Sequence, residues 1–216
     1  MIYNPSIALT TAGYLLQIKA VKLSPKDLFT WASGIKSPIY CDNRVTLSYP
    51  EIRTFIKDQF TEIIRSRFGQ ADLIAGVATG GIAQGALVAQ ELGLPFAYVR
   101  TSKKDHGLTN LIEGRVEAGQ QVVVVEDLIS TGKSSLEVVE ALKHAGCIVA
   151  GMVAIFTYNL PVSESGFKSS ACQLITLTDY DALIEQALAT NYITHDDLNV
   201  LRGFKEALSG NRVGGK

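Results

Sequence analysis

The chain has 216 residues, of which 47% are apolar and 19% are charged. This composition is typical of a globular domain and excludes wholesale disorder. Twenty lysines and arginines against 21 aspartates and glutamates leave a formal net charge of −1, which argues against a protein that coats nucleic acid.

The sequence also lacks the patterns of membrane, secreted and zinc-binding proteins. No apolar run approaches the roughly 18 residues of a membrane helix, and no basic segment leads into an apolar one at the start of the chain. The three cysteines form no CxxC pair, and the three histidines do not fall at zinc-site spacing. We therefore expect a cytoplasmic protein with reduced thiols and no contact with a membrane.

The first 70 residues predict helices with one short strand between them. Ser24-Pro25 is typical of a helix start, with a capping hydroxyl followed by a proline in the first turn. Apolar residues recur at intervals of three and four between Ile52 and Ile64, as on the buried face of a helix. The expected elements are helices over 5–20, 24–31 and 49–68, a strand over 39–41 and a turn at 42–43.

From residue 73 the pattern becomes strand, glycine-rich turn and helix, repeated. The four valines at 122–125 are β-branched, which indicates a strand buried on both faces. We expect strands over 73–77, 95–99, 122–125, 147–156 and 173–177, a helix ending near Gly93 and another over 133–145. This alternation predicts an α/β fold, a parallel sheet with helices on both faces, followed by a flexible tail over 210–216.

The most informative segment is 122–135, VVVVEDLISTGKSS. Gly132-Lys133-Ser134 looks like the end of a nucleotide-binding P-loop, but that motif needs a glycine where this chain has Asp127. The alternative fits better: Glu126 and Asp127 bind ribose hydroxyls or approach Mg²⁺, while the turn after the strand holds a monophosphate at the start of a helix. A surface turn with incidental acids would not explain two charges at the end of a four-valine strand.

One segment departs from the alternation of strands and helices. Residues 100–119 show little apolar periodicity and carry several charged side chains, which are Arg100, Lys103, Lys104, Asp105, His106 and Arg115. A structureless loop of this length in a compact domain is usually functional.

At this point the sequence resembles a known family. Residues 123–135 look like the phosphoribosyl-pyrophosphate (PRPP) motif of type I phosphoribosyltransferases. Three further segments resemble the orotate phosphoribosyltransferases among them: FTWASGIKSPIY at 29–40 resembles an amino-terminal hood, KDHG at 104–107 a mobile catalytic loop, and IEG at 112–114 the return from that loop.

The resemblance implies a domain plan and a reaction. Residues 1–48 would form N-terminal helices and a small hood over the base, and residues 49–209 a type I phosphoribosyltransferase core with a mobile catalytic loop at 100–115. The family transfers ribose 5-phosphate from PRPP to N1 of orotate and releases diphosphate, with Mg²⁺ bound mainly through PRPP. Because the leaving group is a polyanion, cations suit the catalytic task.

The resemblance also implies roles for individual residues. Thr79 and Gly80 lie where the family places its diphosphate loop, without the lysine that some members carry there. The PRPP site would comprise Thr79, Gly80, Arg100, Lys104, His106, Glu126, Asp127, Leu128, Ile129, Ser130, Thr131, Gly132, Lys133 and Ser134. Lys133 stands where the family usually has a small residue, and it either adds a cation near the phosphate or points to solvent.

The expected catalytic residues are Arg100, Lys103, Lys104, His106 and Asp127, and Asp127 is the one protein group expected to approach Mg²⁺. Many members have a lysine directly after the Arg100 position, where this chain has Thr101, and we hypothesise that Lys103 replaces it. In this family the loop reaches into the neighbouring subunit's site, which implies a homodimer.

For orotate, Lys36, Tyr40 and Ser130 are the candidates: an ammonium for the carboxylate, a ring for stacking and a hydroxyl for a ring oxygen. An arginine that some members place after the fourth core strand is replaced here by Phe156-Thr157-Tyr158.

Two other functions fit part of this pattern. A purine phosphoribosyltransferase would share the PRPP core, but the hood and the KDHG loop argue against it. A PRPP-sensing transcriptional regulator should carry a DNA-binding domain or a basic face, for which the chain leaves little room.

Overall fold

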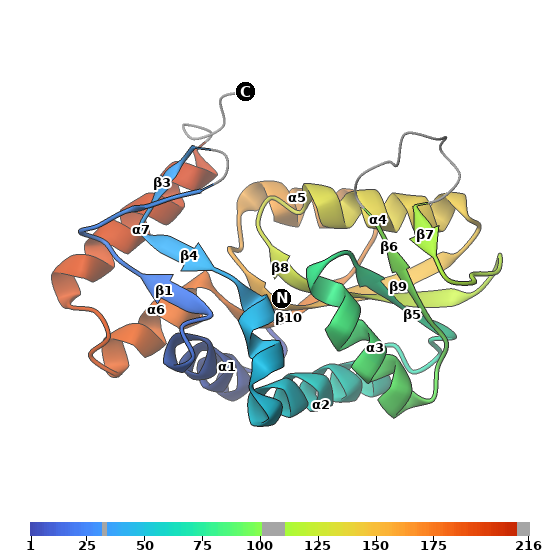
Figure 1. The fold of residues 1–216 in the computed structure, drawn as a ribbon. Coiled ribbons are helices and arrows are strands. Elements are labelled where there is room, and N and C mark those ends of the chain that lie inside the picture. Colours follow the sequence, from blue (N-terminus) through green and yellow to red (C-terminus); the bar gives the residue numbers. More distant parts are fainter. Residues whose placement is uncertain (32–33, 101–110, 211–216) are drawn as a thin grey trace.

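The computed structural model describes residues 1–31, 34–100 and 111–210. Within them a six-stranded sheet runs in the order β10-β9-β8-β5-β6-β7 (Figure 1). The strands pair in parallel except for β7, which returns antiparallel to β6. The strands are β5 (Leu73–Val77), β6 (Phe96–Val99), β7 (Ile112–Glu113), β8 (Gln121–Ile129), β9 (Ile148–Thr157) and β10 (Leu174–Asp179).

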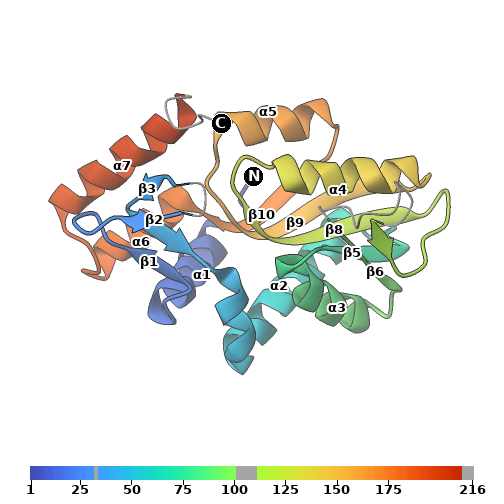
Figure 2. The same ribbon diagram turned by 45° about the horizontal axis from the view of Figure 1, so that its top comes forward.

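Helices cover both faces of this sheet, which confirms the predicted α/β class. Helices α4 and α5 lie over one face, and α1, α2 and α3 lie over the other (Figure 2). Their bounds are α1 (Pro5–Gln17), α2 (Pro50–Arg67), α3 (Gly80–Leu92), α4 (Lys133–His144) and α5 (Pro161–Ser169).

The valine strand shows why both faces must be covered. Val123 and Val125 pack into the core on the α1–α3 face, while Val122 and Val124 pack into the core on the α4 face. All four side chains are fully buried. Successive residues of a strand project to opposite faces, so a run of four β-branched residues requires apolar partners on each side.

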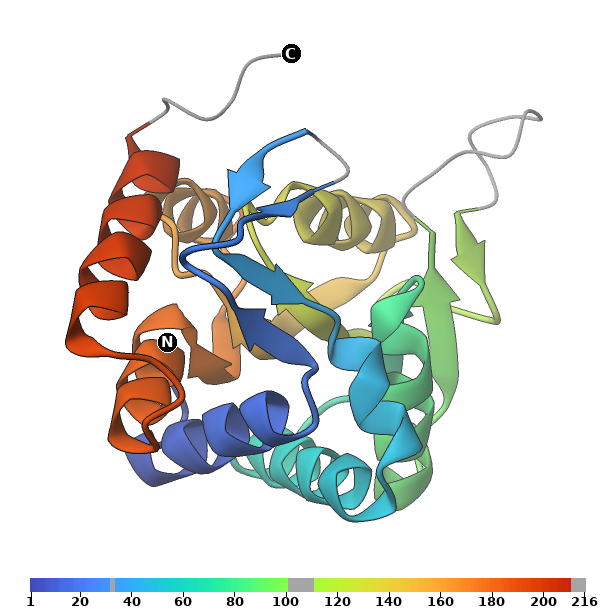
Figure 3. The ribbon, with the colours of Figure 1, turned by 60° about the vertical axis from the view of Figure 1, so that its left-hand side comes forward.

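The helix expected over 24–31 is wrong. Two small antiparallel ladders occur there instead: β1 pairs with β4, and β2 pairs with β3. The amide of Ser24 donates to the carbonyl of Pro38 (2.8 Å), so the backbone of this segment bonds across the hairpin and not along a helix. The elements are β1 (Val21–Leu23), β2 (Phe29–Thr30), β3 (Lys36–Ser37), β4 (Ile39–Cys41) and the 3₁₀ helix η1 (Asn43–Ser48), as Figure 3 shows.

The carboxyl-terminal helices were not predicted. Helices α6 (Tyr180–Ala189) and α7 (His195–Ser209) follow β10, and α1 packs against α6. Trp31 of the hood contacts Tyr158 after β9 and Phe204 of α7, with ring centroids 5.8 and 6.0 Å apart. The core on this face therefore contains residues from both sides of position 48, and the domain boundary expected there stays a prediction.

No helix among the described residues is both long enough and apolar enough to span a bilayer. The tail expected over 210–216 lies, beyond Gly210, outside the described residues.

Candidate active site

The carboxyl ends of the parallel strands meet at one edge of the sheet, and most of the predicted site residues lie there. Thr79 and Gly80 follow β5, Arg100 follows β6, and residues 130–134 follow β8. In open α/β sheets this edge is the usual place for ligands. Lys103, Lys104 and His106, with Thr101, lie outside the described residues.

Glu126 and Asp127 are in the last part of β8 and not beyond its end, because the strand is longer than expected. Their carboxylates point to different helices. Glu126 is buried, and its Oε2 accepts a hydrogen bond from Ser135 Oγ of α4 (2.9 Å). The Asp127 carboxylate lies against Gly80, where α3 begins on the other face. Only Asp127 therefore faces the segment that follows β5.

Burial favours the neutral form of Glu126. It raises the pKa of this side chain well above its ordinary value of 4.5, and the neighbouring Asp127 charge acts in the same direction. The other carboxylate oxygen, Oε1, accepts from the backbone N–H of Asp127 (2.9 Å). Glu126 is thus fixed by hydrogen bonds inside the protein and helps to shape the strand end.

The two glycines after β5 allow α3 to approach β8 closely. A Cβ on Gly80 would overlap the Asp127 carboxyl group, and one on Gly81 would overlap the carbonyl oxygen of Val125. Thr79 is the N-cap residue of α3, and its exposed side chain makes no capping hydrogen bond. The first amides of α3 therefore lie beside the one acid of the pair that faces them.

The turn at 130–134 has the geometry of a phosphate site. Gly132 has a φ of 78°, which suits glycine, and α4 starts directly after it with no side-chain cap. Ser130 is half-buried, while Thr131, Lys133 and Ser134 are exposed. Uncapped amides at the positive end of a helix dipole form a ready anion site. Leu128 and Ile129 pack into the core, so only their backbone is available to a ligand.

The described residues on either side of the predicted catalytic loop are held together. The Arg100 amide donates to the Leu111 carbonyl (2.8 Å), and Arg100 Nη1 lies 3.6 Å from Glu113 Oε1 on β7. The Arg100 side chain is 27% exposed, so the guanidinium remains accessible at the strand end.

The hood carries the two other orotate candidates on its surface. Tyr40 is 40% exposed, and its ring centroid lies 5.8 Å from that of Phe29. Lys36 is exposed, and its Nζ donates to Thr30 Oγ1 (2.7 Å). Tyr158, one of the three residues that stand where the resemblance implies an arginine in some members, is buried in the aromatic cluster described above.

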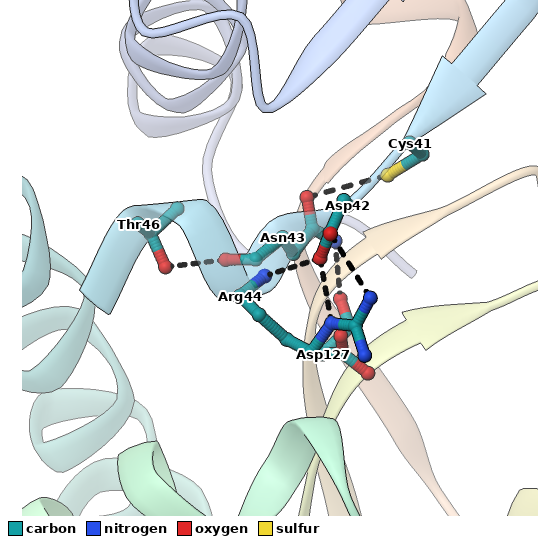
Figure 4. Close-up of polar contacts among 6 residues, drawn as sticks. All are labelled: Cys41, Asp42, Asn43, Arg44, Thr46 and Asp127. Atoms are coloured by element: carbon teal, nitrogen blue, oxygen red, sulfur yellow. Dashed lines mark hydrogen bonds and ion pairs between the residues drawn. The ribbon is translucent and has the colours of Figure 1, made fainter. Parts of the chain in front are cut away.

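The sequence analysis missed Asn43 and Arg44, which lie at and just after the predicted turn. Asn43 is buried, and its Nδ2 donates to the Asp127 carbonyl (2.6 Å), as Figure 4 shows. Arg44 forms a bidentate pair with Asp42, at 2.7 and 2.9 Å. The pKa of Arg44 is raised chiefly by Asp42 and also by Asp127 and Tyr40, so these groups share one electrostatic environment. Three consecutive polar residues, 42–44, directly follow a hood strand, and this pattern in the sequence could have indicated them as site residues.

A resident metal site would need several ligands from the chain. Among the described residues no group of three or more His, Cys, Asp or Glu side chains is placed to hold a metal ion. No described residue donates a hydrogen bond to the Asp127 carboxylate, which is half-buried. One such carboxylate at the site fits an ion such as Mg²⁺ that is held mostly by substrate phosphates and water.

Comparison with known proteins places the chain in one family. A family model described as "Phosphoribosyl transferase domain" matches residues 48–180. The chain is 59% identical over 195 residues to an orotate phosphoribosyltransferase of Bacteroides thetaiotaomicron, covering 90% of this chain and 92% of that one. It is 56% identical to the enzyme of the same name from Lactococcus lactis subsp. cremoris, over 93% and 96% of the two chains.

Solved structures agree with the fold. The crystal structure of orotate phosphoribosyltransferase from Aeropyrum pernix superposes with a TM-score of 0.73 at 26% sequence identity. The superposition covers 85% of this chain and 99% of that chain.

Proposed function

Because this chain belongs to the orotate phosphoribosyltransferase family, we propose that the carboxyl edge of its main sheet is where it transfers ribose 5-phosphate from PRPP to orotate. The reaction gives orotidine 5′-monophosphate and diphosphate, and it serves the synthesis of UMP. The observation that carries the location is the convergence of the 79–80 turn, Asp127 and the 130–134 turn at that edge.

The 5-phosphate binds at the turn 130–134. The amides at the start of α4, of which that of Lys133 makes a long contact with Thr131 Oγ1 (3.5 Å), and the hydroxyls of Ser130, Thr131 and Ser134 supply donors for its oxygens. Lys133 is exposed beside this turn, and its ammonium adds a mobile positive charge. The left-handed conformation of Gly132 lets the backbone turn toward the ligand.

Asp127 accepts hydrogen bonds from the ribose hydroxyls, and the diphosphate lies against Thr79 and Gly80. The uncapped amides at the start of α3 face this position. For Glu126 to reach the ribose as well, its carboxylate must leave Ser135, so its main contribution is to hold the strand end. Mg²⁺, bound mainly by PRPP with Asp127 nearby, neutralises charge on the departing diphosphate.

Four side chains in the first half of the loop at 100–115 assist the leaving group. Arg100 is placed at the end of β6, and Lys103, Lys104 and His106 follow it in sequence. Donors that meet charge as it develops in the transition state are each worth about 10²–10³ in rate. The loop completes the site of a second subunit, so the active species is a homodimer.

Orotate binds under the hood, with Tyr40 stacking on the ring and Lys36 pairing with its carboxylate. Lys36 already donates to Thr30, and the exposed contact is weak enough to be exchanged for a carboxylate. Ser130 lies at the junction of the base and phosphate positions. The protein acts in the cytoplasm on small molecules, without nucleic acid or a membrane as partner.

The first experiment follows orotate absorbance after mixing the protein with PRPP and Mg²⁺. Parallel reactions contain adenine, guanine, hypoxanthine or uracil, and a further one contains orotate with excess chelator. We expect loss of absorbance with orotate alone, and only while Mg²⁺ is free. Consumption of a purine would refute the proposal that the hood binds orotate. No absorbance change with any base would refute the proposed reaction.

Paired variants test the placement of the site. Arg100→Ala should lower kcat by about 10²–10³ because it removes a charge-stabilising donor. Arg115→Ala is the matched control: it removes the same side chain from an exposed position beyond β7, where Arg115 pairs with Glu117. Equal loss in both variants would contradict a specific role for Arg100.

A further inference from the structure

Asn43 connects the hood to the acidic end of β8. It is 1% exposed, and its side-chain amide uses both of its ends. Nδ2 donates to the backbone carbonyl of Asp127 (2.6 Å), and Oδ1 accepts from Cys41 Sγ (3.3 Å). Figure 4 shows this amide between the last residue of β4 and the strand that carries Asp127.

The contact with Asp127 compensates for a missing strand. β5 pairs with β8 only as far as Val125, so the edge of β8 beyond that residue has no neighbour on the β5 side among the described strands. The Asp127 amide is taken by Glu126 Oε1, and its carbonyl is taken by Asn43. Two side chains therefore fix both backbone groups of Asp127, and through them the direction of its carboxylate.

The other contact reaches the base side of the site. Cys41 directly follows Tyr40 in β4. The side-chain amide of Asn43 therefore bonds to the residue next to the proposed stacking ring. Thr46 Oγ1 donates to the backbone carbonyl of Asn43 (2.6 Å), which anchors the start of η1 independently of the side-chain amide. One buried side chain thus sets the position of the hood strand relative to the ribose-binding carboxylate.

We propose that Asn43 is a positioning residue for glycosyl transfer, holding Asp127 and the Tyr40 strand in the register that places the base against the ribose. This inference rests on the proposed roles of Asp127 and Tyr40. Misplacement of reacting groups by about 1 Å can cost about 10²-fold in rate. The loss should therefore appear mainly in kcat, while the KM values for PRPP and orotate change much less.

The first test compares Asn43→Ala with Thr46→Val. Both variants remove a buried hydrogen bond from the same 3₁₀ helix, so both should lower the melting temperature. Only Asn43→Ala removes the contact with Asp127, and we expect its kcat to fall about 10²-fold while Thr46→Val stays within about twofold of the wild type. Equal losses of kcat in the two variants would show that the amide has only a structural role.

Asn43→Asp gives a readout that stability alone would not move. An ionised carboxylate cannot donate to the Asp127 carbonyl, but a protonated carboxyl group can. The kcat of this variant relative to the wild type should rise as the pH falls, because protonation restores a donor. If the kcat of Asn43→Asp relative to the wild type stays constant or falls toward acid pH, the proposal is refuted. This test does not depend on whether Asn43→Ala folds.

Asp127→Asn separates failure of this inference from failure of the site assignment. If Asp127→Asn is as active as the wild type, the proposed site is wrong and the Asn43 argument falls with it. If Asp127→Asn loses activity while Asn43→Ala keeps its kcat, the site stands and only the positioning role is refuted.

Discussion

Gly80 and Gly81 are adjacent, yet alanine at the two positions should damage different properties of the protein. A Cβ at Gly81 would overlap the Val125 carbonyl oxygen and lie 3.3 Å from the Cα of Glu126. These are backbone atoms of the central sheet, so the first turn of α3 must move away from β8. The three atoms nearest to a Cβ at Gly80 all belong to the Asp127 carboxyl group, which can rotate aside.

The magnitudes follow from these two obstacles. Overpacking typically costs about 1–3 kcal/mol, and a contact with strand backbone belongs at the upper end of that range. Alanine recovers up to about 1 kcal/mol of helix propensity relative to glycine. We expect Gly81→Ala to lose about 2 kcal/mol, which lowers the melting temperature of a domain of this size by about 4–8 °C. Gly80→Ala should unfold near the wild-type temperature but lose about 10²-fold in kcat, because Asp127 is displaced.

Thermal unfolding followed by calorimetry, together with the orotate absorbance assay, measures both effects. Gly203→Ala is the control, since Gly203 lies in α7 and an added Cβ would meet no atom within 4 Å, so this variant should gain stability. A melting temperature of Gly81→Ala at or above the wild-type value would refute the packing argument. Full activity in Gly80→Ala would refute the link between this glycine and Asp127.

Two predictions concern ionisation. Burial raises the pKa of Glu126 on folding, so the native state binds more protons than the unfolded state at pH values above about 4.5, and the free energy of unfolding falls as the pH rises through the folded pKa. Denaturant titrations should therefore show the wild type losing stability relative to Glu126→Gln as the pH rises; a constant difference would contradict the buried site. Burial also raises the pKa of Cys172 to about 11, so a thiol reagent at pH 8 should modify it far more slowly in the native protein than in urea. Immediate labelling of Cys172 would show that the side chain is accessible.

The class of the fold and the chemistry of its central motif can both be read from residue types and their spacing. Four consecutive valines require apolar cover on both sides, so the α/β sheet follows from residue type and period alone. The acids and the glycine turn after them indicate a sugar-phosphate site. Both the backbone geometry and the side-chain chemistry of this site come from one short segment of sequence. The long helix at α2 follows from its buried face.

Pairing between distant segments accounts for the rest. Residues 24–31 look like a helix start, but their backbone partners lie in the following hairpin, and no local pattern records such partners. The same holds for the acidic pair, whose two carboxylates separate because α4 and α3 cover opposite faces of β8.

Asn43 is the clearest case of a contact that depends on tertiary packing. It is 84 residues away from Asp127 in sequence, and it became a partner only because β5 ends before β8 does. Sequence patterns report which face a residue presents, whereas the identity of the group that meets it depends on how the whole chain packs. The residues proposed to react were therefore readable in the sequence, and the residue proposed to hold them in place was not.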